Sequence, residues 1–232
     1  MKLIIKQKEP TYLRNHRLIK NTNYESFCRD IGLGNIQPST GFRQYLLEEH
    51  GYLCVYCMRQ IPHKHIEKTI EHDDMKIEHH TSQKKPKSIS TKLDITYSNI
   101  FACCMGNKGR LKKFQTCDTR KGDEPITINP TNKLHIETIK YGFDGLISSN
   151  NEVFDEEINK ILNLNENNLK KQREVIYKLV DKRTKIAFKT LMDRTSKNDY
   201  LTKEIDIWLK AKNHKYKEYC MVAVVYLQNR LR

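Results

Sequence analysis

Cysteine placement is the feature of this 232-residue sequence that most constrains its fold. Five of the seven cysteines fall between residues 54 and 117. An odd count argues against a complete disulfide framework, whereas local clustering is typical of metal binding. Cys54 and Cys57 are separated by two residues, a tight turn that directs both thiolates at one ion. Because tetrahedral zinc takes four ligands, a second pair must come from elsewhere in the chain.

The second pair of ligands is expected between residues 103 and 117. Cys117 is one candidate, and either Cys103 or Cys104 is the other. A lone CxxC pair could also be a redox pair or two buried thiols, which pack as small apolar groups. The second cysteine group favours structural zinc. The basic segment 108–115 is predicted to be a loop inserted between the ligands.

The chain divides into three stretches by composition and hydrophobic period. Residues 1–50 are expected to form an N-terminal arm followed by a helix. Residues 51–150 hold the cysteine groups, a histidine-rich segment and a β-hairpin. Residues 151–232 have the apolar period of helices and are interpreted as scaffold. This combination predicts an α+β fold.

Local signals predict several individual elements. Ser39 or Thr40 can cap a helix that runs from Phe42 to about His50, and Gly51 ends it. Between residues 125 and 148, alternation of apolar and polar residues predicts strands around an Asp-Gly turn. The last helix is predicted from about residue 202 to 231.

Charge and hydropathy narrow the class of protein. The net charge is +14, from 42 Lys and Arg against 28 Asp and Glu. This excess favours a polyanionic partner such as nucleic acid, although a generic basic surface explains charge alone equally well. No apolar run approaches the roughly 20 residues that span a bilayer, and no signal-peptide pattern is present. A cytoplasmic protein without a membrane partner is expected.

The segment Ile77-Glu78-His79-His80 lies between the two cysteine groups. A histidine titrating near neutrality can take a proton from water, and a carboxylate can hold a divalent cation. Adjacent residues on a strand point to opposite faces, so His79 and His80 cannot both face one site. Other histidines and an acidic run are interpreted as surface groups, namely His63, His65, His72 and residues 71–74.

The order of these motifs resembles the ββα-metal finger of HNH endonucleases. The order is Cys54-x-x-Cys57, Glu78-His79, Asn99-Ile-x-x-x-Cys104 and Cys117-Asp118-x-x-Lys121-Gly122. The resemblance implies a finger with structural zinc, embedded in a largely helical protein with a C-terminal helical region. It places the histidine on a strand, the asparagine in the connecting loop and the third position on a helix. It also assigns residues 51–150 as the nuclease domain and favours His79 over His80.

The resemblance implies a role for each site residue. His79 would be the general base, and Glu78 would help hold a catalytic Mg²⁺ or Mn²⁺. Asn99 would orient the histidine and brace its loop. Asp118 stands where His or Asn is usual, and a carboxylate there suits a hard cation. Zinc would be held by Cys54, Cys57, Cys104 and Cys117, and nucleic acid would be contacted by Lys112, Lys113, Arg120 and Lys121.

A narrower resemblance covers nearly the whole chain. Segments outside the finger are similar to the HNH component of Septu-type anti-phage systems and of retron-associated defence modules. These segments are Glu9-Pro10, Tyr45 to Cys57, Ile128-Asn129-Pro130, Phe143-Asp144-Gly145, and Ile161 to Asn165 with Leu169 and Arg173. The similarity implies a nuclease effector with an ABC-type, SMC-like ATPase partner. In retron versions it also implies a reverse transcriptase with its RNA–DNA hybrid.

Two other functions are consistent with these residues. No Walker A pattern is present, so nucleotide hydrolysis would fall to another chain. The unusual Asp118 is consistent with a decayed site in a zinc-stabilised nucleic-acid-binding or adaptor module. A CxxC-based redox protein is the third alternative, but the cysteines lie outside any βαβ pattern.

Overall fold

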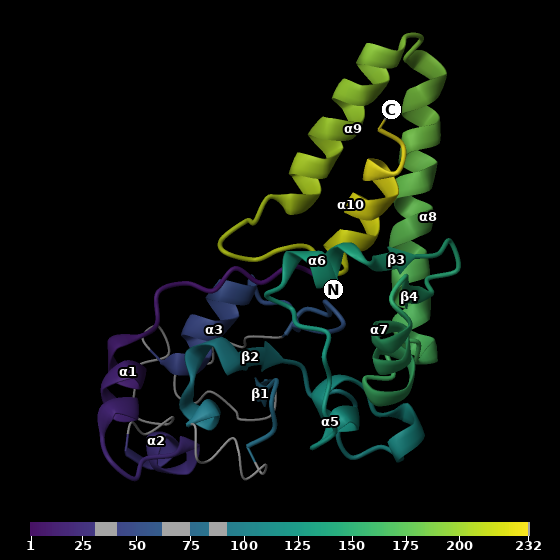
Figure 1. Cartoon of the computed structure of the whole chain (residues 1–232). Helices are drawn as coiled ribbons and strands as arrows, with labels where there is room; N and C mark the ends of the chain where they lie inside the picture. Colours follow the sequence, from purple (N-terminus) through teal and green to yellow (C-terminus); the bar gives the residue numbers. More distant parts are fainter. Residues whose placement is uncertain (31–40, 62–74, 84–91, 232) are drawn as a thin grey trace.

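The computed structural model describes residues 1–30, 41–61, 75–83 and 92–231 (Figure 1). Helices and two two-stranded antiparallel sheets make up this part of the chain, which confirms the mixed α and β composition. Several residues singled out from the sequence lie outside the described residues: Ser39, Thr40, His63, His65, His72 and the acidic run 71–74. No helix in the described residues is long and apolar enough to cross a membrane.

The N-terminal arm runs along the body before the first helices. Residues 1–10 have no regular secondary structure, and the Ile4 N–H donates to the Pro130 carbonyl at 2.9 Å. Helices α1 (Thr11–Leu18) and α2 (Tyr24–Asp30) follow.

Helix α3 (Phe42–His50) leads the chain into the first cysteine pair. It ends at Gly51, whose φ of 62° lies in the left-handed region. A Cβ at Gly51 would lie 2.0 Å from a ring carbon of Tyr216, so no other residue fits this helix end. The predicted helix and its stop are confirmed.

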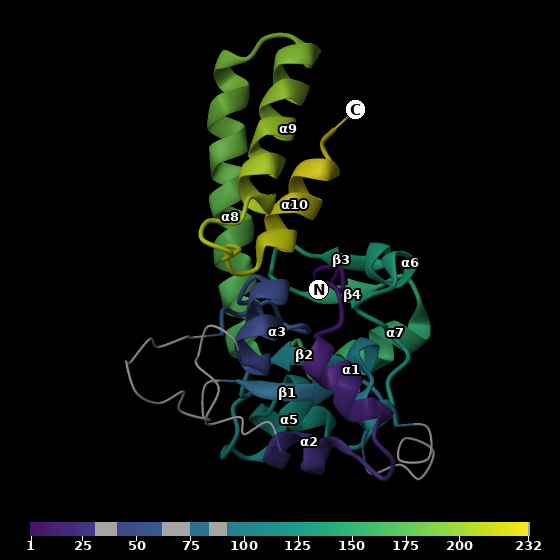
Figure 2. The ribbon, with the colours of Figure 1, turned by 90° about the vertical axis from the view of Figure 1, so that its left-hand side faces the viewer.

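The first sheet joins β1 (Lys76–His79) to β2 (Ile100–Cys103). The strands are antiparallel, with Glu78 opposite Phe101 and His79 opposite Ile100. Two 3-10 turns, η1 (Leu93–Ile95) and η2 (Tyr97–Asn99), precede β2. After η3 (Lys112–Phe114), helix α5 (Cys117–Lys121) lies beside β1 (Figure 2).

The stretch 125–148 differs in part from the prediction. The alternating residues 134–139 do not form one strand, because α6 (Lys133–Glu137) occupies most of them. The Asn132 side chain starts this helix by accepting the Leu134 N–H at 3.0 Å. Strands β3 (Ile139–Tyr141) and β4 (Ile147–Ser149) form a hairpin around the predicted Asp-Gly turn.

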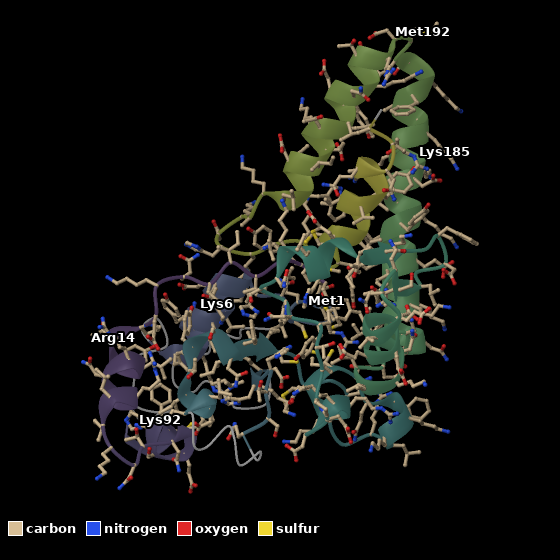
Figure 3. All side chains as sticks on the ribbon, viewed as in Figure 1. Met1, Lys6, Arg14, Lys92, Lys185 and Met192 are labelled. Carbon is tan, nitrogen blue, oxygen red and sulfur yellow. The ribbon has the colours of Figure 1, made fainter. Side chains whose placement is uncertain are left out.

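Helices dominate the remainder of the chain. The short α7 (Glu152–Glu156) continues into a π-helical turn, η4 (Glu157–Ile161). The 24-residue α8 (Asn167–Thr190) and α9 (Arg194–Leu209) then project from the body as a pair (Figures 1 and 2). Met192 lies at the tip of this pair (Figure 3).

The predicted last helix, residues 202 to 231, is divided in two. Helix α9 ends at Leu209, and α10 (Cys220–Gln228) begins after an irregular segment. Asn213 and His214 have φ of 51° and 62° in that segment, a conformation that no α-helix continues through. Helix α10 packs against both α8 and α9.

One buried cluster links all three stretches of the chain, from Met1 to Leu227. Arg173 of α8 is the largest side chain fully buried in the described residues. Its guanidinium donates to the carbonyls of Gly145 at 2.7 Å and Leu164 at 2.9 Å. Arg173 thereby fastens the β3–β4 hairpin to the base of α8.

Candidate metal centre and adjoining pocket

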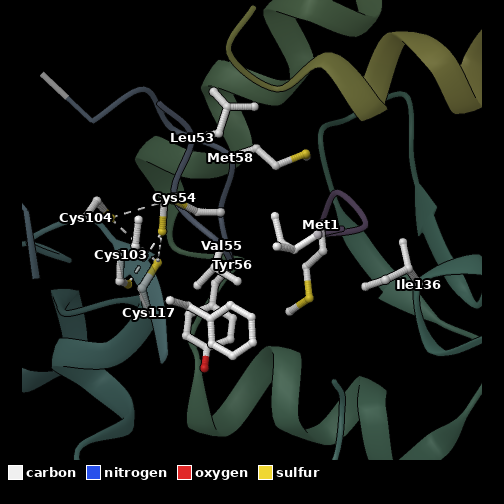
Figure 4. Close-up of a cluster of buried hydrophobic side chains, with 14 of the residues drawn as sticks. Met1, Leu53, Cys54, Val55, Tyr56, Met58, Cys103, Cys104, Cys117 and Ile136 are labelled. Carbon is white, nitrogen blue, oxygen red and sulfur yellow. Dashed lines mark hydrogen bonds between the residues drawn. The ribbon is translucent and has the colours of Figure 1, made fainter. Parts of the chain in front are cut away.

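Four buried cysteines converge on one point. The Sγ atoms of Cys54, Cys57, Cys104 and Cys117 all lie within 4.8 Å of one another. The sulfur of Cys104 is 3.7 Å from that of Cys57 and 3.9 Å from that of Cys117. With a Zn–S bond of about 2.3 Å, tetrahedral geometry puts ligand sulfurs about 3.8 Å apart. The cluster could therefore hold a metal such as zinc (Figure 4).

Three segments of the chain supply the cysteines. Cys54 and Cys57 lie in a turn in which the Met58 N–H donates to the Cys54 carbonyl at 3.1 Å. The Val55 N–H of this turn donates to the Ala102 carbonyl of β2 at 3.0 Å. Cys104 directly follows β2, and Cys117 is the first residue of α5. The cluster thus joins the turn after α3 to the end of β2 and the start of α5.

Cys104, and not Cys103, belongs to the four-sulfur group. Cys103 is also buried, with its sulfur 3.6 Å from that of Cys54, but it lies outside the group. Hydrogen bonds from Cys103 and Cys117 lower the pKa of Cys104 to about 5. Burial raises the pKa of Cys103 well above its ordinary value. The alternative left open by the sequence is resolved in favour of Cys104 on geometry.

The four thiols of the cluster differ in the direction in which their pKa values are shifted. Hydrogen bonds from neighbouring thiols lower the pKa of Cys54, although burial opposes this change. Hydrogen bonds from neighbouring sulfurs raise the pKa of Cys57 and of Cys117. Four thiolates crowded in a buried site repel one another unless a cation neutralises them. The donor set therefore fits a divalent ion.

A pocket of about 220 Å³ lies beside the cluster, between β1 and α5. It is lined by the end of β1, the residues that follow β1, and α5 with the residues after it. The side chains that matter chemically are Glu78, His79, Gln83, Asp118, Lys121 and Asp123. Three residues singled out from the sequence, Glu78, His79 and Asp118, are brought together here.

His79 is buried and held by both ring nitrogens. Its Nε2 lies 2.8 Å from the Asp94 carbonyl oxygen, and its Nδ1 lies 2.7 Å from the Gln83 amide nitrogen. Since a carbonyl only accepts, we assign the ring proton to Nε2 and the lone pair to Nδ1. Burial lowers the pKa of His79 to about 4. The ring is therefore neutral near pH 7, with Nδ1 able to accept a proton.

Asn99 braces the segments that flank the histidine. Its Oδ1 accepts the Thr81 N–H at 2.7 Å. Its Nδ2 donates to the carbonyls of Thr81 at 3.0 Å and Leu93 at 2.9 Å. Leu93 directly precedes Asp94, whose carbonyl holds His79. Asn99 therefore acts on the histidine indirectly, through the backbone.

Glu78 and Asp118 form a carboxylate pair. Glu78 accepts hydrogen bonds from the Tyr56 hydroxyl at 2.6 Å and from the Lys121 ammonium at 2.9 Å. Burial, reinforced by the hydrogen-bonded Asp118, raises the pKa of Glu78 to about 8. The pKa of Asp118 is lowered despite its burial, because Glu78 and the paired Lys76 stabilise its charge. Glu78 thus carries the shared proton at neutral pH.

Two of the predicted nucleic-acid contacts are engaged with other groups of the chain, Lys121 in the interior and Arg120 at the surface. Lys121 is only 2% exposed, and besides Glu78 it contacts the His79 carbonyl at 3.1 Å. It lies within the pocket wall instead of on the surface that flanking phosphates would reach. Arg120 donates to the Lys112 carbonyl at 3.0 Å. Lys112 and Lys113 are exposed, as a phosphate contact requires.

Several partners of the carboxyl groups and the histidine in the pocket were not identified from the sequence. Lys76 lies two residues before Glu78 on β1, so strand alternation could have placed both on one face. Tyr56 lies inside the CxxC turn, and nothing marks it as a partner of Glu78. Gln83 carries no local signal, because its position depends on the fold of the residues after β1.

A scan of the sequence against protein-family models and a search of curated proteins returned no match.

Proposed function

We propose that this chain is a metal-dependent endonuclease that hydrolyses phosphodiester bonds, with His79 as general base. One observation carries the proposal: a neutral buried histidine and a carboxylate pair line the same pocket. The element order β1, connecting segment, β2 and α5 supports the resemblance to HNH endonucleases. The net charge of +14 suits a polyanionic substrate.

The chemistry assigns a task to each side chain. Nδ1 of His79 takes a proton from water, the water oxygen attacks phosphorus, and the bond to the leaving oxygen breaks. Asp94 keeps the histidine in the required tautomer through its carbonyl. Gln83 must leave Nδ1 to admit the water. Mg²⁺ or Mn²⁺ held by Glu78 and Asp118 would neutralise the charge that develops on the phosphate oxygens.

Zinc in the cysteine cluster is proposed to be structural. Four cysteine ligands leave no open coordination position for water or substrate. Cys117 directly precedes Asp118, so the cluster fixes where one carboxylate of the pocket lies. The ion would therefore position the site without taking part in its chemistry.

The wider resemblance extends the proposal to a biological role in anti-phage defence. It supports a toxic effector of an anti-phage system, working with an ABC-type ATPase and, in retron versions, a reverse transcriptase. An ATPase gene adjacent to the gene for this chain would support that assignment. An adjacent reverse transcriptase gene would identify the retron version.

One observation favours the alternative of a zinc-stabilised nucleic-acid-binding or adaptor module. Lys121 contacts Glu78 and Lys76 pairs with Asp118, so both carboxyl groups already have cationic partners within the chain. In the nuclease, a divalent cation must displace these ammonium groups and the proton on Glu78. In the adaptor, these contacts are permanent.

Cleavage in the presence of a defined metal separates the two functions. Zinc-loaded protein should nick supercoiled plasmid DNA or cut RNA when Mg²⁺ or Mn²⁺ is added. Omitting the added ion, instead of chelating it, leaves the cluster zinc in place as the control. Nucleic-acid binding without turnover in either metal would establish the adaptor.

Metal binding by the pocket should depend on pH. Because Glu78 has a pKa of about 8 in the ion-free pocket, the cation must displace a proton below that pH. We expect Mn²⁺ affinity to fall about tenfold per pH unit below 8 and to level off above it. Titration followed by electron paramagnetic resonance of free Mn²⁺ measures this, on zinc-loaded protein.

The matched variant for the pH experiment is Glu78→Gln. Glutamine keeps an acceptor for Tyr56 but has no proton to lose, so Mn²⁺ affinity should be weak and independent of pH. A flat pH profile in the unmodified chain would contradict the assignment of Glu78 as a ligand.

A further inference from the structure

The segment between the metal-ligating Cys104 and Cys117 is a basic loop, defined here as residues 105–116. It carries four cations within six residues, Lys108, Arg110, Lys112 and Lys113, and no acidic residue. All residues from 108 to 114 are exposed. The loop is thus a concentrated, solvent-facing positive surface.

The neck of the loop is closed by the chain itself. The Thr116 N–H donates to the Gly106 carbonyl at 3.0 Å. A Cβ at Gly106 would lie 2.1 Å from the Thr116 carbonyl oxygen, so glycine is required for this approach. Since the neck adjoins two metal ligands, the loop starts from a fixed base.

Side-chain donors hold the backbone of the loop in one conformation. Asn163 donates to the carbonyls of Lys113 at 3.0 Å and Gln115 at 2.9 Å. Asn107 donates to the Phe114 carbonyl at 2.7 Å, and Arg120 donates to the Lys112 carbonyl. With these carbonyls engaged, the loop presents its side chains to solvent in a preorganised form, which lowers the entropic cost of binding.

An apolar residue lies in the middle of these cations. Leu111 is 69% exposed and is flanked in sequence by Arg110 and Lys112. Phe114 is 39% exposed, with the Lys113 ammonium 5.0 Å from its ring centroid. A single exposed leucine is ordinary on a protein surface. Here the leucine lies between cations on a loop held by hydrogen bonds, an arrangement that suits a ligand with both anionic and apolar groups. Phosphates complement the cations, and stacked bases complement the leucine.

We propose that the basic loop docks in the minor groove of duplex DNA, with Leu111 inserted as a wedge between base pairs. Apolar side chains are used in this way where a protein kinks the duplex, while neighbouring cations contact the flanking phosphates. The minor groove of RNA duplexes is wide and shallow, so it would not enclose an inserted side chain in this way. A second copy of the chain is disfavoured as occupant, because it would bring the same positive charge.

This inference rests on the proposed nuclease function and deepens it by assigning a substrate class. The loop leads through Cys117 directly into Asp118, so DNA held by the loop is connected by a short, rigid path to the pocket. Insertion of Leu111 would select duplex that bends easily, without reading base edges.

The test measures DNA binding without added Mg²⁺ or Mn²⁺, so it is independent of cleavage. Fluorescence anisotropy of zinc-loaded full-length protein on a 30-base-pair duplex gives affinity, and 2-aminopurine in the duplex reports unstacking. Leu111→Ala should weaken binding about tenfold and abolish the unstacking signal, with the salt dependence unchanged. The double change Lys112→Ala and Lys113→Ala should reduce the salt slope by about 2 and keep the unstacking signal.

Leu134→Ala provides the matched control, because Leu134 is a 73% exposed leucine on α6. It should bind and unstack DNA like the unmodified chain. Equal binding and equal unstacking by Leu111→Ala would overturn the wedge, and so would equal affinity for duplex RNA or single-stranded DNA. Binding to an acidic protein with no affinity for DNA would also overturn it. If the chain binds and unstacks DNA but never cleaves it, the nuclease proposal fails while the wedge stands.

Discussion

Cys57→Ser should leave the chain largely unfolded or without bound zinc. Cys57 is one of four buried cysteines whose sulfurs are spaced as the ligands of a tetrahedral ion would be, and the cluster joins three segments of the body. Structural zinc contributes on the order of 10 kcal/mol to folding in small zinc domains, which is comparable to the entire stability of a typical protein. Loss of one ligand therefore removes a large fraction of the free energy of unfolding. Elemental analysis should show about one zinc per unmodified chain and much less in the variant.

The matched control is Cys103→Ala. Cys103 is equally buried and adjacent to the cluster, but it is outside the four-sulfur group. Its replacement should keep the zinc and cost about 1 kcal/mol of stability for the lost packing. Thermal unfolding followed by circular dichroism compares the two variants. An unmodified chain that folds without metal, or equal zinc loss in both variants, would contradict the assignment.

His79→Gln should lower the rate of nucleic-acid cleavage by about 10²- to 10⁴-fold, the usual contribution of a general base. Glutamine can still donate to the Asp94 carbonyl, so the change removes the proton acceptor while it keeps a polar contact. Where the metal is kept saturating at each pH, unmodified protein should remain active down to about pH 5, because burial lowers the pKa of His79 to about 4 and the ring stays neutral. Single-turnover cleavage of a labelled duplex at saturating metal measures both effects.

The adjacent histidine offers a closely matched control for this experiment. His80 also holds a backbone carbonyl, that of Ile128, with its Nε2 at 3.0 Å, and its pKa is also lowered by burial. It is not among the residues that line the pocket. His80→Gln should therefore change stability by a similar amount and leave cleavage nearly intact. Equal cleavage by both variants, each with zinc bound, would remove His79 from the catalytic role.

Local chemistry made part of the fold predictable. Helix α3 and its end at Gly51 follow from apolar spacing and from a glycine where only glycine fits. The cysteine cluster was predictable because zinc takes four ligands of few residue types, so a CxxC pair calls for a second cysteine group even 47 residues away. The β3–β4 hairpin follows from its Asp-Gly turn.

Other elements depend on information that a local pattern does not contain. The alternation at residues 134–139 resembled a strand, but the Asn132 cap starts a helix there and leaves Leu134 exposed. The break between α9 and α10 follows from left-handed residues at 213 and 214 that carry no glycine signal. These outcomes were set by side-chain capping and tertiary packing, which override intrinsic propensity.

The candidate site likewise has parts that the sequence predicts and parts that depend on tertiary packing. The order of the sequence motifs predicts one site that contains His79, Glu78 and Asp118, and these three side chains line the same pocket. The role of Lys121 could not be inferred, because its burial against Glu78 depends on how α5 packs on β1. Gln83 and the Asp94 carbonyl likewise reach His79 only through the folded path of the residues between the strands.

The neck of the basic loop has an evolutionary consequence. Since the Gly106–Thr116 contact and the adjoining cysteines set the separation of the loop ends, the length between them is decoupled from the geometry of the pocket. Surface segments with clamped ends tolerate insertion and replacement well. Residues 108–114 would therefore be free to diverge between related chains, and under the proposed DNA contact such changes would alter the nucleic-acid preference while the pocket stayed the same.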